Sequence, residues 1–378
     1  MMSSIVMRRV LTVALATALS PLMLAMSASS AITPDPNSIR ITADKQNYNL
    51  AQKRYFLNGK VTVAYQDMRI SGPVAEVEMD DAGKPQVANF FKRPVFKRIK
   101  PTLGEDVVVG DVIKVYLADD RYGAQGNVDS HIATVAADPF HIRSDIQEFD
   151  NKNKVVSASG NVHVDYQGSQ AMSSLANVRM KENGKADRVI FSGGAQIKKE
   201  NSEIHGDRIT VMVDSGNLIA EHNVNTRVDL KKQDAPAQSP SQSPDDNPSR
   251  VFITSDYQEY DKNSDTMIAS GNVKIVYGDY VATGPKATFK LKNNDLERIF
   301  LTGRPTIVET GRTITADKIT ITTNPKNFDA VGNVKVNFKP SQKPSQSAAA
   351  KPAAGTAKAA AKGQVSGKVL PKDEPSDY

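Results

Sequence analysis

Histidine and acidic side chains are the groups of this chain that could carry acid–base or metal chemistry. Metal sites combine histidines and carboxylates at recurring spacings. The histidines show no such spacing and are scattered along the chain: His131, His141, His163, His205 and His222. The paired acids stand in turn or linker contexts: Asp80 with Asp81, Asp119 with Asp120, and Asp245 with Asp246. The chain also lacks cysteine, a Gly-x-Ser-x-Gly elbow and a phosphate-binding glycine loop. The sequence therefore predicts no catalytic site, no metal site and no cofactor.

A repeated spacing along the chain indicates which kind of secondary structure positions these residues. Three Ile-x-x-Asp segments are each followed by a glycine 15 residues after the aspartate: Asp44 with Gly59, Asp145 with Gly160, and Asp256 with Gly271. A weaker copy with the same spacing lies inside each repeat: Asp111 with Gly126, Asp207 with His222, and Asp317 with Gly332. Such internal repetition is the signature of a repeat architecture. We expect the aspartates to form turns at strand ends and the glycines to adopt positive φ or to form bulges.

The segment after each glycine alternates between apolar and polar residues. In the first repeat Val61, Val63 and Tyr65 fall on one face, and Lys60 and Thr62 fall on the other. This period of two, rich in β-branched residues and bounded by Gly, Asn, Asp and Pro, is typical of strands buried on one side. No segment of the body has the pattern of an amphipathic helix. The sequence predicts an all-β protein with about 25 to 30 strands.

The two ends differ from the body in composition and charge. Residues 1–31 are interpreted as a cleaved secretory signal, because Arg8 and Arg9 precede an apolar stretch and Ala31 ends a small-residue cleavage site. An uncleaved membrane anchor is the alternative. Residues 339–378 are rich in Ala, Lys and Pro, and we expect them to be disordered. The ends carry +2 and +4 of the net charge of +6, so the body is neutral. A neutral body excludes nucleic acid as a partner.

The repeats resemble a known family in the combination of their motifs. The order Ile-Thr-Ala-Asp, a hairpin, Ala-x-Gly-Asn-Val-x-Val-x-Tyr, Gly-Pro and Phe-x-Gly-x-Pro-x-Ile is similar to the OstA-type domain of LptA-like proteins. Those proteins bridge the periplasm during lipopolysaccharide transport. The last motif runs from Phe300 to Ile307, and degenerate forms occupy residues 191–197 and 91–96. The resemblance covers nearly all of residues 39–338. It implies an elongated, twisted antiparallel β-jellyroll, V-shaped in section, with an apolar interior.

The resemblance also implies a division of the chain and a function. We expect a signal peptide (1–31), three OstA-like repeats (39–140, 141–232 and 251–338), a linker rich in Pro and Ser (233–250) and a tail (339–378). The implied function is a periplasmic bridge whose apolar groove shields the acyl chains of lipopolysaccharide or a similar glycolipid. Shielding removes an exposure cost of about 0.8 kcal/mol per methylene. The implied partners are further copies and OstA-like domains of inner- and outer-membrane transport components, joined by end-to-end strand pairing.

The inward residues of the alternating strands are the candidate lipid-binding residues of that groove. They are Val61, Val63, Tyr65, Val162, Val164, Tyr166, Val273, Ile275, Tyr277, Val334 and Val336. Core packing explains the same alternation at any one of these positions, and only the resemblance favours a groove. Two other functions stay open. The chain could be a membrane-anchored, LptC-like component of the same system. It could also be an adhesin or polysaccharide-binding protein, although it has no Trp for an aromatic platform.

Overall fold

The computed structural model describes residues 38–134, 139–230, 250–292 and 295–339. Within these ranges the chain forms strands, turns and loops only, which confirms the predicted all-β class. The described residues contain no helix that is long and apolar enough to cross a membrane. Their strands number 24, slightly fewer than predicted, because many are 11 to 14 residues long. The predicted signal peptide, almost all of the linker and all but the first residue of the tail lie outside the described residues.

The predicted first repeat contains nine strands. They are β1 (Arg40–Thr42), β2 (Lys45–Asn49), β3 (Arg54–Tyr65), β4 (Met68–Met79), β5 (Pro85–Phe91), β6 (Val95–Lys100), β7 (Gly104–Val109), β8 (Val112–Tyr116) and β9 (Arg121–Ile132). The strands of the second are β10 (Phe140–Asp150), β11 (Val155–Tyr166), β12 (Ser169–Met180), β13 (Ala186–Lys199), β14 (Ser202–Met212) and β15 (Leu218–Asp229).

The predicted third repeat begins with three long strands and ends with six shorter ones. They are β16 (Arg250–Asp261), β17 (Thr266–Tyr277), β18 (Tyr280–Lys292), β19 (Asp295–Thr302), β20 (Thr306–Glu309), β21 (Arg312–Thr315), β22 (Lys318–Thr322), β23 (Asn327–Val331) and β24 (Lys335–Phe338).

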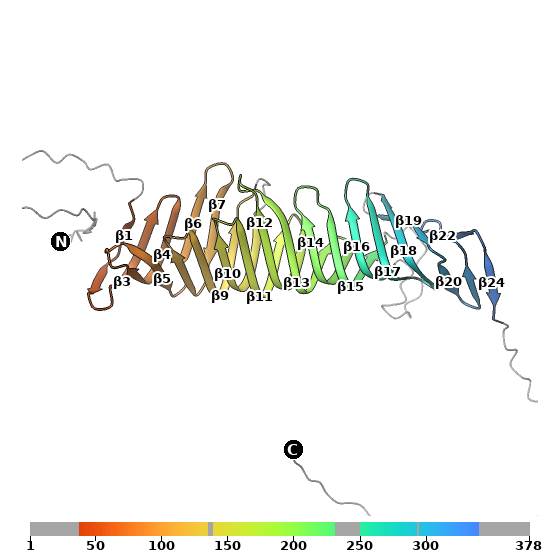
Figure 1. Cartoon of the computed structure of the whole chain (residues 1–378), viewed down its shortest axis with the longest axis horizontal. Helices are drawn as coiled ribbons and strands as arrows, with labels where there is room; N and C mark the ends of the chain where they lie inside the picture. The colour runs from red at the N-terminus through yellow and green to blue at the C-terminus, as the bar shows by residue number, and fades with distance from the viewer. Residues whose placement is uncertain (1–37, 135–138, 231–249, 293–294, 340–378) are drawn as a thin grey trace, which may run out of the picture. The chain divides into compact units, whose positions relative to one another are not determined.

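All 24 described strands belong to one antiparallel sheet, and neighbours in the sequence are mostly neighbours in space (Figure 1). From β9 to β18 each strand pairs with the next along nearly its whole length. The pairing of β15 with β16 continues this ladder across the predicted linker, from Leu218 opposite Tyr260 to Asp229 opposite Arg250. The described strands of all three repeats therefore share one sheet.

The repeated Asp–Gly spacing forms a corner in the middle of several long strands, β11 and β17 among them. At Gly160 the backbone takes a φ of +74°, and the ladder between β11 and β10 shifts register beside it. The next residue, Asn161, has positive φ as well, and its Nδ2 donates a hydrogen bond of 2.9 Å to Oδ2 of Asp145. Four further corners repeat this Asn–Asp hydrogen bond at 2.8 Å: Asn127 with Asp111, Asn223 with Asp207, Asn272 with Asp256, and Asn333 with Asp317.

The corner corrects one sequence-based expectation. Asp145 and Asp256 lie inside β10 and β16, so their predicted place at strand ends is wrong. A bulge bends the strand at these residues without interrupting the sheet, because the extra residue is absorbed by positive-φ backbone. The prediction of positive φ is confirmed for the glycines of the spacing. His222 replaces glycine at one corner and still adopts a φ of +60°.

The Phe-x-Gly-x-Pro-x-Ile motif forms a second kind of corner. Two successive residues adopt positive φ in each copy: Lys92 and Arg93, Gly193 and Gly194, and Gly303 and Arg304. In the first and third copies the strand is interrupted here, so β4 pairs with both β5 and β6, and β18 pairs with both β19 and β20. In the second copy β13 continues through a register shift. The sequence variants of this motif thus share one backbone turn.

The corners fold the sheet so that both of its arms enclose an apolar interior. Phe90 and Phe96 lie before and after one corner, and both are fully buried in the same core cluster. Stacked rings extend this core along the sheet, with Phe96 on Tyr122 at 3.9 Å and Tyr122 on Phe149 at 4.4 Å between centroids. A second cluster, which includes Val251 and Ile321, fills the interior of the predicted third repeat. The structure is therefore the predicted antiparallel β-jellyroll, with its core in two clusters.

Candidate functional site

The predicted lipid-binding residues have three different environments. Those closest to the centre of each core are almost completely buried, with exposed fractions of 0 to 4%: Val61, Val63, Val162, Val164, Val273, Ile275 and Tyr277. Tyr65 and Tyr166 are half-buried against the first cluster. The alternation predicted correctly which face of these strands turns inward. It did not distinguish residues that fill the core from residues next to free space.

Val334 and Val336 differ from the other predicted residues because they are exposed. Their exposed fractions are 47% and 43%, and Val336 lies on β24, which pairs only with β21 among the described strands. The described chain does not enclose these two residues, and their place in the lipid groove stays a prediction. The physical reason is their position at the last strand, where no further described strand covers them.

An apolar cavity of about 580 Å³ separates the two core clusters. Its lining comes from strands β10 to β19 and includes members of both clusters, such as Val164 and Phe191 from the first and Ile253 and Phe289 from the second. Other interior side chains at this place are only half-buried: Ile204, Val211, Val213, Leu218 and Tyr260. The ladder between β15 and β16 stays continuous here. The cavity therefore exists because the side chains leave space between the two clusters, and the backbone pairing of the sheet is not interrupted there.

Polar groups lie at the border of this cavity. Thr226 lines it and donates a 2.6 Å hydrogen bond to Oε1 of the buried Gln258. Nε2 of Gln258 has no hydrogen-bond partner within the described chain. Tyr260 donates to Asp265 at 3.2 Å, and burial, reinforced by that carboxylate, raises the pKa of its phenol to about 12. Tyr260 therefore stays a neutral hydrogen-bond donor at physiological pH. The lining combines a majority of apolar side chains with polar and charged ones, such as Lys199 and Lys262.

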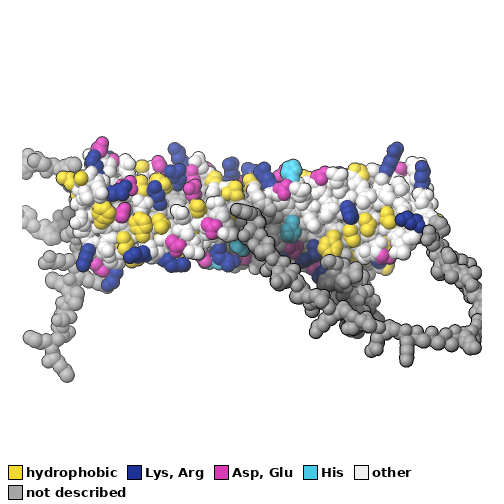
Figure 2. Space-filling model, turned by 90° about the horizontal axis from the view of Figure 1, so that it is seen from below, with side chains coloured by type: hydrophobic (Ala, Val, Ile, Leu, Met, Phe, Trp, Pro, Cys, Tyr) yellow, Lys and Arg dark blue, Asp and Glu magenta, His cyan; other side chains and the backbone are white. Residues whose placement is uncertain are grey.

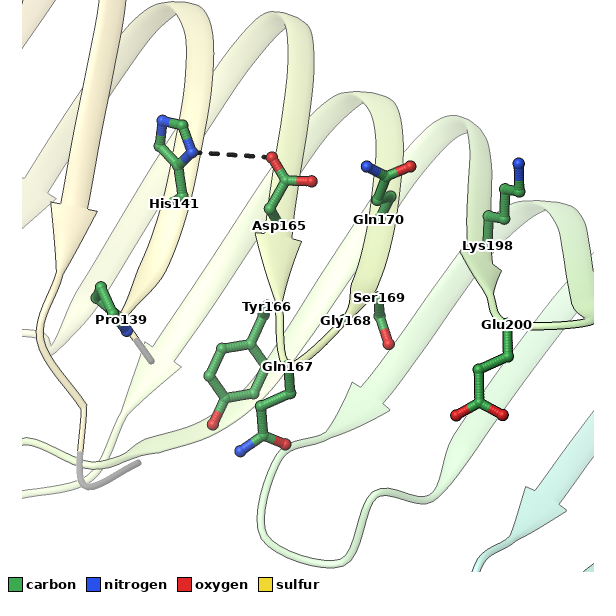
Figure 3. Close-up of a pocket in the computed structure, with 10 residues that line it drawn as sticks. All are labelled: Pro139, His141, Asp165, Tyr166, Gln167, Gly168, Ser169, Gln170, Lys198 and Glu200. Carbon is green, nitrogen blue, oxygen red and sulfur yellow. Dashed lines mark ion pairs between the residues drawn. The ribbon is translucent and has the colours of Figure 1, made fainter. Parts of the chain in front are cut away.

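A second depression, of about 420 Å³, lies at the surface around β10 to β13 (Figure 3). Its lining is mostly polar and includes His141, whose Nδ1 is 3.8 Å from Oδ2 of Asp165. His141 also lies close to Asp129 and His131. The side-chain atoms of these three residues that could bind a metal ion are within 4.8 Å of one another. The interpretation of the histidines as scattered is wrong for this pair. Strand pairing brings together His131 and His141, whose spacing of ten residues matches no metal motif.

The outer surface of the sheet carries charges of both signs. Figure 2 shows acidic and basic side chains interspersed over the face seen there, with apolar side chains between them. Many of these charges pair across strands, as Arg54 does with Glu78 at 2.9 Å and Arg227 with Glu203 at 2.8 Å. An exposed pair such as Arg54 with Glu78 contributes little stability. The paired charges do give the sheet a polar exterior around its apolar interior.

Part of the chain is similar to proteins of lipopolysaccharide transport. Residues 252–368 match the family described as LptA/(LptD N-terminal domain) LPS transport protein, which confirms the resemblance predicted from the repeats. A solved structure of LptH, the LptA homologous periplasmic component of the lipopolysaccharide transport device from Pseudomonas aeruginosa, is also similar. It is 15% identical, with a TM-score of 0.32, and the match covers 35% of this chain and 99% of that one. No curated protein matches the chain.

Proposed function

We propose that this protein carries lipopolysaccharide or a similar glycolipid across the periplasm, from the inner to the outer membrane. The proposal is based on the match of residues 252–368 to a lipopolysaccharide-transport family. The acyl chains lie inside the folded sheet, and the polar exterior faces water. The cavity between the two core clusters is the site at which an acyl chain enters the interior. The protein acts by binding and shielding, and the side chains that carry this function are apolar.

The cavity is the observation that carries this proposal. Its volume of about 580 Å³ lies within the range of about 300–1,000 Å³ that is usual for small-molecule pockets. Away from the cavity and from the last strand, most of the predicted groove residues are buried in the core, as Val61 and Ile275 are at 0% and 1% exposed. An acyl chain could reach those residues only by displacing core side chains. At the cavity it finds free volume, and ten buried methylenes would contribute about 8 kcal/mol.

Photocrosslinking along one strand tests the proposal. A photoreactive side chain at Ile204, which lines the cavity, should crosslink to labelled lipopolysaccharide. The matched control is the neighbouring position His205, which is exposed on the outer face of β14 and should crosslink at least about 10-fold less, because alternate side chains face opposite sides of a strand. Protein purified gently from its host should also contain glycolipid by mass spectrometry. Equal crosslinking at both positions, with no lipid recovered, would reject the carrier.

We also propose that copies of this protein join end to end through their free sheet edges. At one end, among the strands that the structure describes, β1 and β2 each pair only with β3. At the other end of the described sheet β23 pairs only with β22, and β24 only with β21. Unpaired strand edges present backbone donors and acceptors that another strand can complete. Large apolar side chains are exposed at this second edge, among them Val331 at 63% and Phe338 at 72%.

Charges at the second edge are therefore expected to weaken self-association. The double variant Val331→Lys with Phe338→Lys should raise the dissociation constant at least about 10-fold, because lysine on an edge strand disfavours pairing and the apolar contact is removed. Ile99→Lys is the control, since Ile99 is 60% exposed but lies on β6, which is already paired on both sides. Sedimentation velocity over a concentration series measures the effect. An unchanged distribution of oligomers in the double variant would contradict this edge as the interface.

A further inference from the structure

Three neighbouring strands bring two histidines and two aspartates together on the outer face. His141 on β10 lies opposite His131 on β9 and opposite Asp165 on β11, and Asp129 lies one outward position further along β9. The residues between them, Ser130 and Ile142, point inward and are buried. The side chains of His131, His141 and Asp129 are 49%, 30% and 42% exposed, so a dissolved ion can reach them.

The geometry of this cluster resembles a set of metal ligands. Oδ1 of Asp129 is 3.0 Å from Nε2 of His141 and 3.7 Å from Nδ1 of His131. The two imidazole rings lie almost parallel, 4.3 Å apart at an angle of 13°. Ligand atoms about 2.0–2.2 Å from a tetrahedral metal lie roughly 3.3 Å from each other. Small side-chain rotations would therefore place all three ligand atoms around one ion.

Two carboxylates flank the imidazole of His141, one beside each ring nitrogen. Its Nε2 contacts Asp129, and its Nδ1 lies 3.8 Å from Oδ2 of Asp165 (Figure 3). A histidine that ligates a metal through one nitrogen carries its hydrogen on the other nitrogen, where a carboxylate can accept it. A metal at Nε2 would be shared with Asp129 and would let the Nδ1 hydrogen point to Asp165.

We propose that Asp129, His131 and His141 form a binding site for one divalent transition-metal ion of the zinc class. Two imidazole nitrogens and one carboxylate oxygen are ligands that zinc accepts, and water would complete the coordination. Asp165 is a positioning residue, since a carboxylate that holds the second nitrogen of a ligating histidine fixes its orientation. Arg143 in turn holds Asp165 through an ion pair of 3.1 Å.

The site would connect two predicted repeats. Asp129 and His131 belong to the last strand of the first repeat, and His141 belongs to the first strand of the second. A bound ion would add a cross-link between β9 and β10 at the outer face. Because it binds the folded protein in preference to the unfolded chain, the ion should also raise the unfolding temperature.

A titration of the full-length protein, free of any histidine tag, with Co²⁺ and then Zn²⁺ at pH 7.5 tests this inference. We expect visible d–d absorption that saturates at one equivalent of Co²⁺, disappears when Zn²⁺ is added, and accompanies a higher unfolding temperature. The variants His131→Ala and His141→Ala should each weaken binding at least about 10-fold, and Asp165→Asn about 10-fold, as is usual when the partner of a ligating histidine is removed.

The control is His205→Ala. His205 also contacts a carboxylate, Glu203 at 2.9 Å, but no second imidazole stacks on it in the described part of the chain, so its loss should leave the titration unchanged. All the replaced side chains are at least 30% exposed, and circular dichroism verifies that each variant is folded. The inference is overturned by the absence of one-equivalent binding in the wild type. It is overturned equally by unchanged binding in the double variant His131→Ala with His141→Ala.

Discussion

Gly160→Ala is expected to lower the free energy of unfolding by about 3 kcal/mol, because it combines backbone strain with a steric clash. The φ of +74° at Gly160 costs a residue with a side chain about 1–2 kcal/mol. A Cβ added there would lie 2.3 Å from Oδ2 and 2.9 Å from Cβ of Asp145. Since even the Cβ of Asp145 is too close, rotation of the carboxylate alone cannot relieve the clash. The hydrogen bond from Asn161 to Asp145 would be lost as well.

Gly168→Ala separates the two contributions. Gly168 lies in the tight turn between β11 and β12 with a φ of +72°, yet nothing lies within 4 Å of an added Cβ. This variant should therefore show only the strain, about 1–2 kcal/mol. Urea unfolding followed by far-ultraviolet circular dichroism measures both variants on the same scale. Equal losses for the two glycines would mean that the contact with Asp145 contributes nothing to the corner.

The corner explains why the sequence predicted the fold so well. The spacing of 15 residues from Asp145 to Gly160 is the length of one hairpin measured between two facing corner positions. Asp145 and Gly160 belong to one local structure, the corner, so the same spacing recurs in the sequence wherever a corner of this kind forms. The alternation of Val162 and Val164 likewise follows from the pleat of one strand. Local geometry of this kind can be read without knowing which strands are neighbours.

The functional features could not be read in the same way. The cavity depends on how far side chains such as Val211 and Leu218 extend into the interior from different strands, and no single segment records that distance. The pairing of His131 with His141 depends on the register of β9 against β10. Exposure of Val334 depends on the end of the described sheet, where alternation continues but a covering strand does not. Each of these features arises from packing between segments.

Filling the cavity is expected to abolish most lipid binding while the protein stays folded. In the variant Ala171→Trp with Val211→Phe, both replaced residues line the cavity, on β12 and β14. If the new rings exclude only three methylenes of an acyl chain, the loss is about 2.4 kcal/mol, or roughly 50-fold in affinity. Binding of a fluorescent lipopolysaccharide measures the change. The stability should be maintained or increased, because the rings occupy free volume and bury apolar surface.

A shift of one residue along each strand gives the matched control, Met172→Trp with Met212→Phe. These positions point to the opposite face from Ala171 and Val211, so the same rings are added outside the cavity. Lipid affinity should stay within about twofold of the wild type. Because the cavity-filled protein is expected to be at least as stable as the wild type, loss of binding in that variant alone would come from occupied volume and not from unfolding. Retained affinity in a cavity-filled protein of unchanged stability would place the acyl chains elsewhere on the sheet.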